Sequence, residues 1–297
     1  MRVARTVGDV RAALWGAPRP VVLVPTMGAL HEGHLSLIRH ARARGETVVV
    51  SVFVNPAQFG EAADLDGYPR DKASDVALAR AAGADVVFAP PLEEMYPHGF
   101  ATAVEVGGPL TSELEGDPRH RGPGHFRGVT TVVAKLLNIV GPDVALFGQK
   151  DAQQALVIRR LVRDLDFPVA IETLPTVRDA DGLALSSRNA RLSPDERRRA
   201  LGLSRALRAA EARVADGERK ARAVLAAARE ELDAAGLDPE YLELRSADDL
   251  SPVGRADENV LVCVAARVGG VRLIDNVVLR APAEALSDPL SLTGAAQ

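Results

Sequence analysis

The chain has 297 residues, enough to bury a full core and to form two domains. Its 36 basic and 40 acidic residues nearly balance, which gives no electrostatic reason to expect a nucleic-acid partner. The single cysteine, Cys263, excludes an intramolecular disulfide and is typical of a reducing compartment.

Targeting and membrane segments are not expected. Arg2, Arg5 and Asp9 interrupt the apolar stretch that a signal peptide needs. No run approaches the roughly 18 apolar residues of a membrane helix. We therefore expect a soluble, cytoplasmic protein with no membrane partner. The apolar run Val260–Ala266 predicts that Cys263 is a buried core thiol rather than a nucleophile.

Apolar runs alternate with helical patterns through the first half of the chain. Near-continuous apolar strands separated by helices indicate a parallel sheet covered by helices on both faces. Residues 90–127, rich in Pro and Gly, are expected to form an irregular insertion with one short strand near Thr102–Val106. The predicted strands are Val21–Val24, Thr47–Val54, Asp85–Phe88, Asp143–Phe147 and Pro168–Leu174, and the predicted helices lie near 34–44, 70–83, 128–140 and 151–165.

The pattern changes near residue 176. A capping-box pattern at Ser193–Glu196, with proline in the first helical position, begins long helices that continue to about residue 235. Strands are predicted at Tyr241–Arg245, Val260–Val268 and Val271–Leu279, the last two joined by a hairpin. We predict a catalytic domain over residues 1–176 and a smaller α+β domain over 177–297, with little to bury after about Pro282.

The loop Pro25–His34 follows a predicted buried strand and precedes a helical pattern. A helix N-terminus offers unpaired N–H groups and partial positive charge, which favour phosphate. His31 and His34 are three residues apart, so they share a side of a helix. Gly28 and Gly33 would allow the backbone to approach a ligand closely. The loop therefore predicts a nucleotide triphosphate site without a lysine-bearing P-loop.

Two further loops also follow predicted strands. Asn55–Gly60 follows the second strand listed above, and Gly148–Gln154 follows the fourth. Ligands of parallel sheets bind at the carboxyl ends of the strands, so the three loops predict one composite site. Lys150 suits a phosphate contact, although a solvated surface lysine is the ordinary alternative. Gln58 and Gln154 can each donate and accept, which suits a hydroxyl or carboxylate.

A fourth polar segment, Arg178–Asn189, lies near the predicted domain boundary. Ser186, Ser187 and Arg188 could donate several hydrogen bonds to phosphate oxygens, and Gly182 would permit a bend. This pattern predicts a clamp that closes over ATP, and a polar linker without a ligand is the alternative. A protein-bound metal is not expected, because the histidine spacing differs from that of zinc helices and only His125 offers a third ligand.

Several strings of the chain resemble the pantoate–β-alanine ligase family, within the His-x-Gly-His nucleotidyltransferase superfamily. Pro25–His34 carries the strongest resemblance, and further strings follow in the same order over about residues 20–280: Phe53–Gly60, Tyr68–Arg70, His125–Val129, Phe147–Asp151 and Leu185–Asn189. The resemblance implies a Rossmann-like domain with a C-terminal lid domain. It also implies a homodimer that joins pantoate to β-alanine with ATP and Mg²⁺, releasing AMP and pyrophosphate, without a tightly bound cofactor.

The resemblance also implies site residues. His34 matches the family's proton donor, and we expect His31, Lys150, Ser186, Ser187 and Arg188 to share the catalytic role. Gln58 and Gln154 match pantoate positions, with Gln58 also close to β-alanine. The implied ATP site consists of Met27, Gly28, Ala29, Leu30, His31, Glu32, Gly33, His34, Gly148, Gln149, Lys150, Asp151, Val177, Leu185, Ser186, Ser187 and Arg188.

Two positions depart from the family pattern. The family usually has arginine three residues before the histidine that matches His125, where this chain has Gly122 and places Arg121 one residue earlier. Ala152 stands where a tyrosine is common. Two other functions remain open: another His-x-Gly-His adenylyltransferase with a phosphate acceptor, and a nucleotide-binding protein without catalysis.

Overall fold

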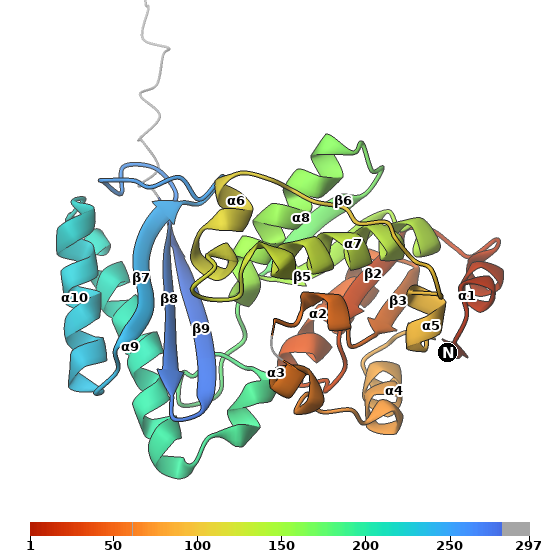
Figure 1. The fold of residues 1–297 in the computed structure, drawn as a ribbon, viewed down its shortest axis with the longest axis horizontal. Helices are drawn as coiled ribbons and strands as arrows, with labels where there is room; N and C mark the ends of the chain where they lie inside the picture. The colour runs from red at the N-terminus through yellow and green to blue at the C-terminus, as the bar shows by residue number, and fades with distance from the viewer. Residues whose placement is uncertain (61, 281–297) are drawn as a thin grey trace, which may run out of the picture.

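A six-stranded parallel sheet forms the centre of the N-terminal part of the computed structural model, which describes residues 1–60 and 62–280. The strand order is β1-β4-β3-β2-β5-β6 (Figure 1). Their bounds are β1 (Arg2–Ala4), β2 (Val21–Thr26), β3 (Thr47–Val52), β4 (Val86–Phe88), β5 (Val144–Gly148) and β6 (Ala170–Leu174). Because β3, β2 and β5 are parallel neighbours, the loops after them open on one edge, as predicted.

Helices cover both faces of this sheet, which confirms the predicted α/β fold. Side chains alternate along β2: Val21 and Leu23 pack with α1 and α7, whereas Val22 and Val24 pack with α2 and α4. No helix in the described ranges is long and apolar enough to cross a bilayer. The main helices are α1 (Val7–Leu14), α2 (Glu32–Arg44), α4 (Lys72–Ala81), α7 (Pro123–Val140) and α8 (Ala152–Asp164).

The first strand and the first helix were not predicted from sequence. β1 has three residues and pairs with β4 at the edge of the sheet, too short a run to show a period. α1 carries a capping box in which Thr6 and Asp9 bond reciprocally to the backbone. This capping box was the sequence signal from which α1 could have been predicted, because such a pattern marks the start of a helix.

The insertion between β4 and α7 contains α5 (Leu92–Met95), α6 (Pro109–Ser112) and the short 3₁₀ helix η2 (Leu114–Gly116). The strand predicted near Thr102–Val106 is wrong. The Val104 carbonyl accepts from the Thr130 hydroxyl at 2.6 Å, and the Val104 N–H donates to Thr131 Oγ1 at 3.0 Å. These side chains of α7 take the backbone groups that a strand partner would need.

The second half forms the predicted α+β unit. An antiparallel sheet of β7 (Pro239–Ser246), β8 (Val260–Val268) and β9 (Val271–Leu279) packs on α9 (Pro194–Ala215) and α10 (Ala221–Ala234). The turn between β8 and β9 holds Gly269 at φ +59°, a conformation that glycine adopts without strain. The prediction for the tail after Pro282 lies outside the described residues.

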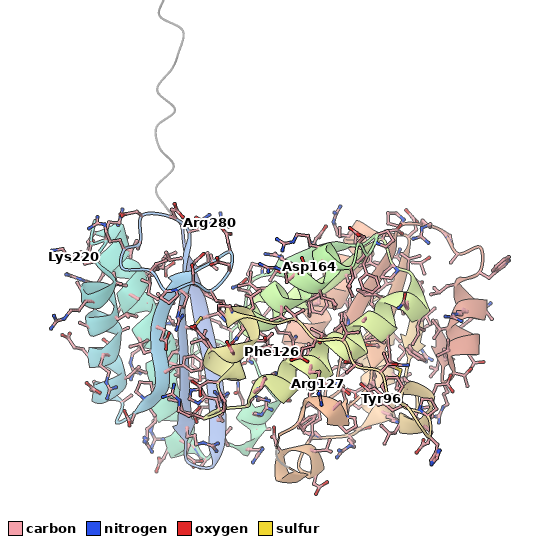
Figure 2. All side chains as sticks on the ribbon, turned by 45° about the horizontal axis from the view of Figure 1, so that its top comes forward. Tyr96, Phe126, Arg127, Asp164, Lys220 and Arg280 are labelled. Carbon is pink, nitrogen blue, oxygen red and sulfur yellow. The ribbon has the colours of Figure 1, made fainter. Side chains whose placement is uncertain are left out.

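The small sheet is apolar on both faces. Val262 and Val264 of β8 pack on α9 and α10, while Leu261 and Cys263 pack against the N-terminal part beside Phe126 of α7. Figure 2 shows Phe126 between the two halves of the molecule. Cys263 is buried, as predicted, and burial raises the pKa of its thiol. An apolar face buried between the two parts holds them together.

Gly128 of α7 makes a close packing contact possible. A Cβ at this position would lie 2.2 Å from the Ala57 carbonyl oxygen in η1 (Pro56–Gln58). We expect Gly128→Ala to lower the free energy of unfolding by about 1–3 kcal/mol, the usual cost of overpacking. Gly124→Ala on the same helix is the control, since a Cβ there meets open space. Urea unfolding of both variants tests this, and equal stabilities would contradict it.

Candidate active site

A cavity of about 270 Å³ opens between the parallel sheet and the small sheet. Its wall combines the loops after β2, β3 and β5 with the segment before α9 and with β9. The predicted convergence on one cavity is therefore observed. The predicted site residues on its wall are Met27, His31, Gly33, His34, Gln58, Gly148, Lys150, Asp151, Gln154, Val177, Leu185, Ser186, Ser187 and Arg188.

Five residues of the expected ATP site do not belong to this wall: Gly28, Ala29, Leu30, Glu32 and Gln149. Glu32 forms an exposed ion pair with Arg39. Gln149 bonds through its side-chain amide to Asn276 Oδ1 at 3.0 Å, so it joins the two halves of the molecule. The other three residues, Gly28, Ala29 and Leu30, form the loop that leads into His31.

His31 and His34 are fixed by the start of α2. His31 is the N-cap: its Nδ1 accepts from the Gly33 N–H at 3.2 Å, and the His31 N–H donates to His34 Nδ1 at 3.4 Å. The two ring centroids are 4.1 Å apart. Because each Nδ1 accepts a hydrogen bond, each neutral ring carries its proton on Nε2.

Burial keeps both histidines uncharged. It lowers the pKa of His31, with the Lys150 charge as the second cause. Burial also lowers the pKa of His34 to about 3, helped by the charge that His31 gains when it is protonated. Desolvation disfavours the charged form of an imidazole. At neutral pH the pair therefore offers N–H donors without adding positive charge.

Asp75 of α4 anchors the turn before these histidines. It is 3% exposed, and its carboxylate accepts from the Ala29 N–H at 3.1 Å and the Leu30 N–H at 2.8 Å. A Cβ on Gly28, whose φ is +85°, would lie 2.7 Å from the Asp75 carboxylate. The glycine therefore makes room for Asp75. Sequence reasoning missed Asp75, because it lies 45 residues beyond Leu30.

Asp75→Ala should lower the free energy of unfolding by about 2 kcal/mol, since the buried Leu30 N–H and the part-buried Ala29 N–H lose a charged acceptor. Asp75→Asn keeps one acceptor oxygen and should cost about half as much. The exposed Asp71 is a poor control, because it is the N-cap of α4 and its loss would itself destabilise that helix. Asp66→Asn on α3 (Ala62–Asp66) is the better control. If Asp75→Ala had the same free energy of unfolding as this control, the anchoring role of Asp75 would be wrong.

Gln58 is positioned by Asn55. The buried Asn55 side chain donates to Gln58 Oε1 and to the Gly128 carbonyl, both at 3.0 Å, and its Oδ1 accepts from the Tyr96 hydroxyl at 2.7 Å. The Gln58 amide nitrogen lies 3.1 Å from the Met27 sulfur. Asn55 lies in the string Phe53–Gly60 that carries the family resemblance. In the structure its side chain orients the Gln58 amide through this hydrogen bond.

Lys150 lies on η3 (Gln149–Asp151), directly after β5. Its side chain is 19% exposed, and its Nζ lies 3.6 Å from Asp151 Oδ1. The carbonyls of Gln149 and Lys150 accept from the Asn276 amide at 3.0 and 2.9 Å. β9 therefore braces the backbone that carries the lysine.

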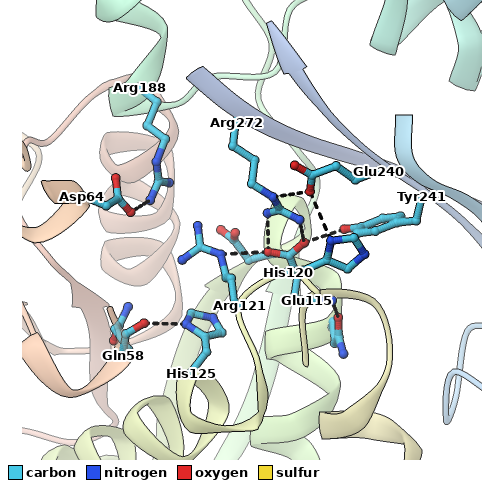
Figure 3. Close-up of polar contacts among 12 residues, drawn as sticks. Gln58, Asp64, Glu115, His120, Arg121, His125, Arg188, Glu240, Tyr241 and Arg272 are labelled. Atoms are coloured by element: carbon cyan, nitrogen blue, oxygen red, sulfur yellow. Dashed lines mark hydrogen bonds and ion pairs between the residues drawn. The ribbon is translucent and has the colours of Figure 1, made fainter. Parts of the chain in front are cut away.

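Ser186–Arg188 enters the cavity wall at the start of η4 (Ser187–Arg191). Ser186 Oγ accepts from the Arg188 N–H at 3.3 Å. The Arg188 side chain donates to Asp64 of α3 at 3.0 Å (Figure 3). In this form of the molecule Arg188 thus connects the segment before α9 to the N-terminal part.

Two other side chains, His125 and Arg121, line the cavity near Gln58. His125 Nδ1 lies 2.7 Å from the Gln58 carbonyl oxygen, and burial, followed by the Arg121 charge, lowers the pKa of His125 to about 4. Arg121 lines the cavity and donates through Nε to Glu115 at 3.0 Å (Figure 3). Glu115 also binds Arg272 and Tyr241 of the small sheet. Tyr241 and Arg272 lie 126 and 157 residues from Glu115 in the chain, so no sequence motif predicts this cluster.

Within residues 1–60 and 62–280, no three His, Cys, Asp or Glu side chains group as a metal site. Two of the acidic side chains on the wall, Glu115 and Asp275, are already paired with arginines. Their charge is therefore engaged within the protein.

Comparisons with known proteins agree with the fold. The family model described as pantoate-beta-alanine ligase matches residues 2–278. The pantothenate synthetase of Roseiflexus castenholzii is 54% identical over 282 residues, which cover 95% of this chain and 100% of that protein.

Two solved structures are also similar. That of the Thermus thermophilus pantothenate synthetase has a TM-score of 0.90 at 49% identity, covering 94% of this chain and 100% of that one. That of the Francisella tularensis pantoate-beta-alanine ligase, complexed with an ATP compound and beta-alanine, has a TM-score of 0.78 at 32% identity, covering 94% and 97%. By sequence, coverage and fold, this chain belongs to the pantoate–β-alanine ligase family.

Proposed function

We propose that this cavity condenses pantoate with β-alanine at the expense of ATP, in two steps. The pantoate carboxylate first attacks the α-phosphorus of ATP, which forms pantoyl adenylate and releases pyrophosphate. The β-alanine amine then attacks the acyl carbon, an amide bond forms and AMP leaves. The observation that carries this proposal is the meeting of two neutral histidines, a lysine and two glutamines in one cavity.

The phosphates would lie against His31, His34 and Lys150. The two Nε2–H groups donate hydrogen bonds, and the lysine supplies the positive charge that the leaving pyrophosphate needs. The proton that His34 offers is that of a neutral imidazole, in keeping with its low pKa. Ser186, Ser187 and Arg188 would bind the departing phosphates from the opposite wall. The remaining wall residues of the expected ATP site would surround the nucleotide.

Gln58 and Gln154 would hold pantoate. The contact with Asn55 occupies Gln58 Oε1 and so fixes which way the amide group points. A fixed amide holds the reacting carboxylate in line with the α-phosphorus, which is where positioning has its largest effect. Gln154 lies on α8, one turn beyond Lys150, and completes the same wall.

Magnesium would enter bound to the triphosphate. Magnesium in nucleotide enzymes usually keeps waters and substrate phosphates as ligands, rather than a cage of protein side chains. Of the acidic wall residues, Glu115 and Asp275 pair with arginines and Asp151 lies 3.6 Å from the Lys150 ammonium, which fits this arrangement. The metal would neutralise phosphate charge in the first step.

Closure over the substrates is proposed for the segment 178–189. The small sheet is held to the N-terminal part by a buried apolar face, so moving it as a body would expose that face. The segment before α9 instead contacts the N-terminal part through the ion pair between Arg188 and Asp64. The domain boundary at 176/177 stays a prediction. We also propose a homodimer, as the family resemblance implies, and a cytoplasmic location, as the single cysteine and the composition predict.

Pyrophosphate release tests this function. With ATP, Mg²⁺ and pantoate alone, we expect one stoichiometric burst, which β-alanine converts into steady turnover. Absence of any pantoate-dependent pyrophosphate would remove the ligase function. ATP binding without pyrophosphate release would favour a nucleotide-binding protein, and release that depends on a phosphorylated acceptor would favour another adenylyltransferase.

A further inference from the structure

Glu115 is the centre of an ion-pair cluster that joins the two halves of the molecule. Arg272 of β9 donates to both of its carboxylate oxygens at 2.7 Å, and the Tyr241 hydroxyl of β7 donates at 2.8 Å. Arg121, from the loop before α7, donates at 3.0 Å (Figure 3). The acceptor thus lies in the N-terminal part, and two of its three donors come from the small sheet.

Arg121 has a weaker share of negative charge than Arg272. Glu115 pairs with both guanidinium groups, whereas Arg272 also pairs with Glu240. Burial alone would raise the pKa of Glu115, but the hydrogen bonds and charges of Arg272 and Arg121 lower it to about 2. The nearby Asp64 is paired with Arg188. Arg121 therefore relies on a carboxylate that Arg272 also uses, and an anion bound in the cavity would give it a second negative partner.

Arg121 is the member of the cluster that can receive such an anion. Its side chain is 21% exposed and lines the cavity. Only its Nε is used by Glu115, and its two terminal nitrogens have no hydrogen-bond partner among the residues that the structure describes. Figure 3 shows these nitrogens on the side turned away from Glu115, in the region of Gln58, His125 and Arg188. Arginine binds carboxylates through two such N–H groups.

We propose that Arg121 binds the carboxylate of β-alanine, and that Glu115, held by Arg272 and Tyr241, positions Arg121 for this contact. The proposal rests on the proposed function. Pantoate loses its carboxylate charge when it becomes the adenylate, so the carboxylate still free in the second step is that of β-alanine. Anchoring it leaves the amine at the other end to attack the acyl carbon.

The small sheet thereby takes part in substrate selection. Arg272 also bonds through Nε to Glu240 of β7 at 2.6 Å, which fixes its orientation toward Glu115. Glu115 is 7% exposed and cannot turn away from its three donors without leaving them unpaired. Arg121 therefore takes its direction from side chains more than 100 residues away in the chain. A preorganised donor loses less entropy on binding than a mobile one.

The first test replaces Arg121 with Gln. We expect the pantoate-dependent pyrophosphate burst to keep its size and rate, while KM for β-alanine rises about 10- to 100-fold, as for a lost charged hydrogen bond. Arg121→Lys should recover part of the affinity. Arg119→Gln, on the same loop but 82% exposed, is the matched control and should match wild type. The melting temperature is recorded for each protein.

The preference for β-alanine over β-alaninamide gives a second readout. It is a ratio measured on one protein, so it does not depend on how much of a variant is folded. Wild type should use β-alaninamide, which lacks the negative charge, at least 10-fold less efficiently than β-alanine. Arg121→Gln should lose most of this preference. A wild type that uses the amide equally well would overturn the proposal.

Tyr241→Phe tests the positioning part, because it removes one donor to Glu115 and leaves both arginines. We expect KM for β-alanine to rise several-fold with an unchanged burst. A merely structural role would instead lower the burst and the turnover together, and that result would overturn the positioning role. An unchanged KM in Arg121→Gln overturns the proposal while leaving the ligase function intact. No burst in wild type would mean that the proposed function itself had failed.

Discussion

Lys150→Ala should slow pyrophosphate release about 30- to 1,000-fold. The lysine follows β5 on a braced turn and is only partly exposed, so its charge reaches the phosphates without full screening by water. Loss of one preorganised donor to a developing negative charge costs about 2–4 kcal/mol in the transition state. Rapid mixing with ATP, Mg²⁺ and pantoate in the absence of β-alanine measures this first step alone.

Two variants control this experiment. Lys150→Arg keeps the charge but changes its shape, and should recover part of the rate. Lys220→Ala removes an exposed lysine at the start of α10, on the outer side of the molecule (Figure 2), and should leave the rate unchanged. A Lys150→Ala burst as fast as that of Lys220→Ala would show that the phosphates do not depend on Lys150.

The position of the site could be predicted because it follows from local patterns. The apolar runs at Val21–Val24 and Asp143–Phe147 marked strands, and parallel neighbours bring their carboxyl ends to one edge. His31 and Lys150 then had to lie near one another, and the Lys150 charge indeed acts on the pKa of His31. Each step needed only a few adjacent residues and one rule of sheet topology.

The support of the site could not be predicted in the same way. Asp75 bonds to Leu30 across 45 residues, and Arg272 to Glu115 across 157. No spacing in the sequence links such pairs, and each residue alone reads as an ordinary surface charge. Local patterns also fail where side chains take the place of a neighbouring strand. The Thr130 hydroxyl donates to the Val104 carbonyl, which would otherwise bond to a strand partner in the segment Thr102–Val106. Charged pairs between distant segments become visible only once the fold brings them together.

Acidification should destabilise the protein through its buried histidines. The pKa of His34 falls from 6.5 to about 3 on folding and that of His125 to about 4, so below pH 6.5 the unfolded chain binds more protons. The stability they contribute is complete above pH 6.5 and is lost as the pH falls toward their folded values. Between pH 8 and pH 5, each should lower the free energy of unfolding by about 2 kcal/mol.

Urea unfolding at several pH values between 8 and 5 measures this loss. Glutamine does not titrate, so His34→Gln and His125→Gln should each remove about 2 kcal/mol of the pH dependence, whatever they do to stability at pH 8. His98→Gln, which replaces an exposed histidine, is the control variant. Above pH 5 most carboxylates stay ionised in both states, so the slope in this window reports mainly on histidines. If His34→Gln kept the full wild-type slope, His34 would bind its proton equally well in the folded and unfolded states, and burial would not be lowering its pKa.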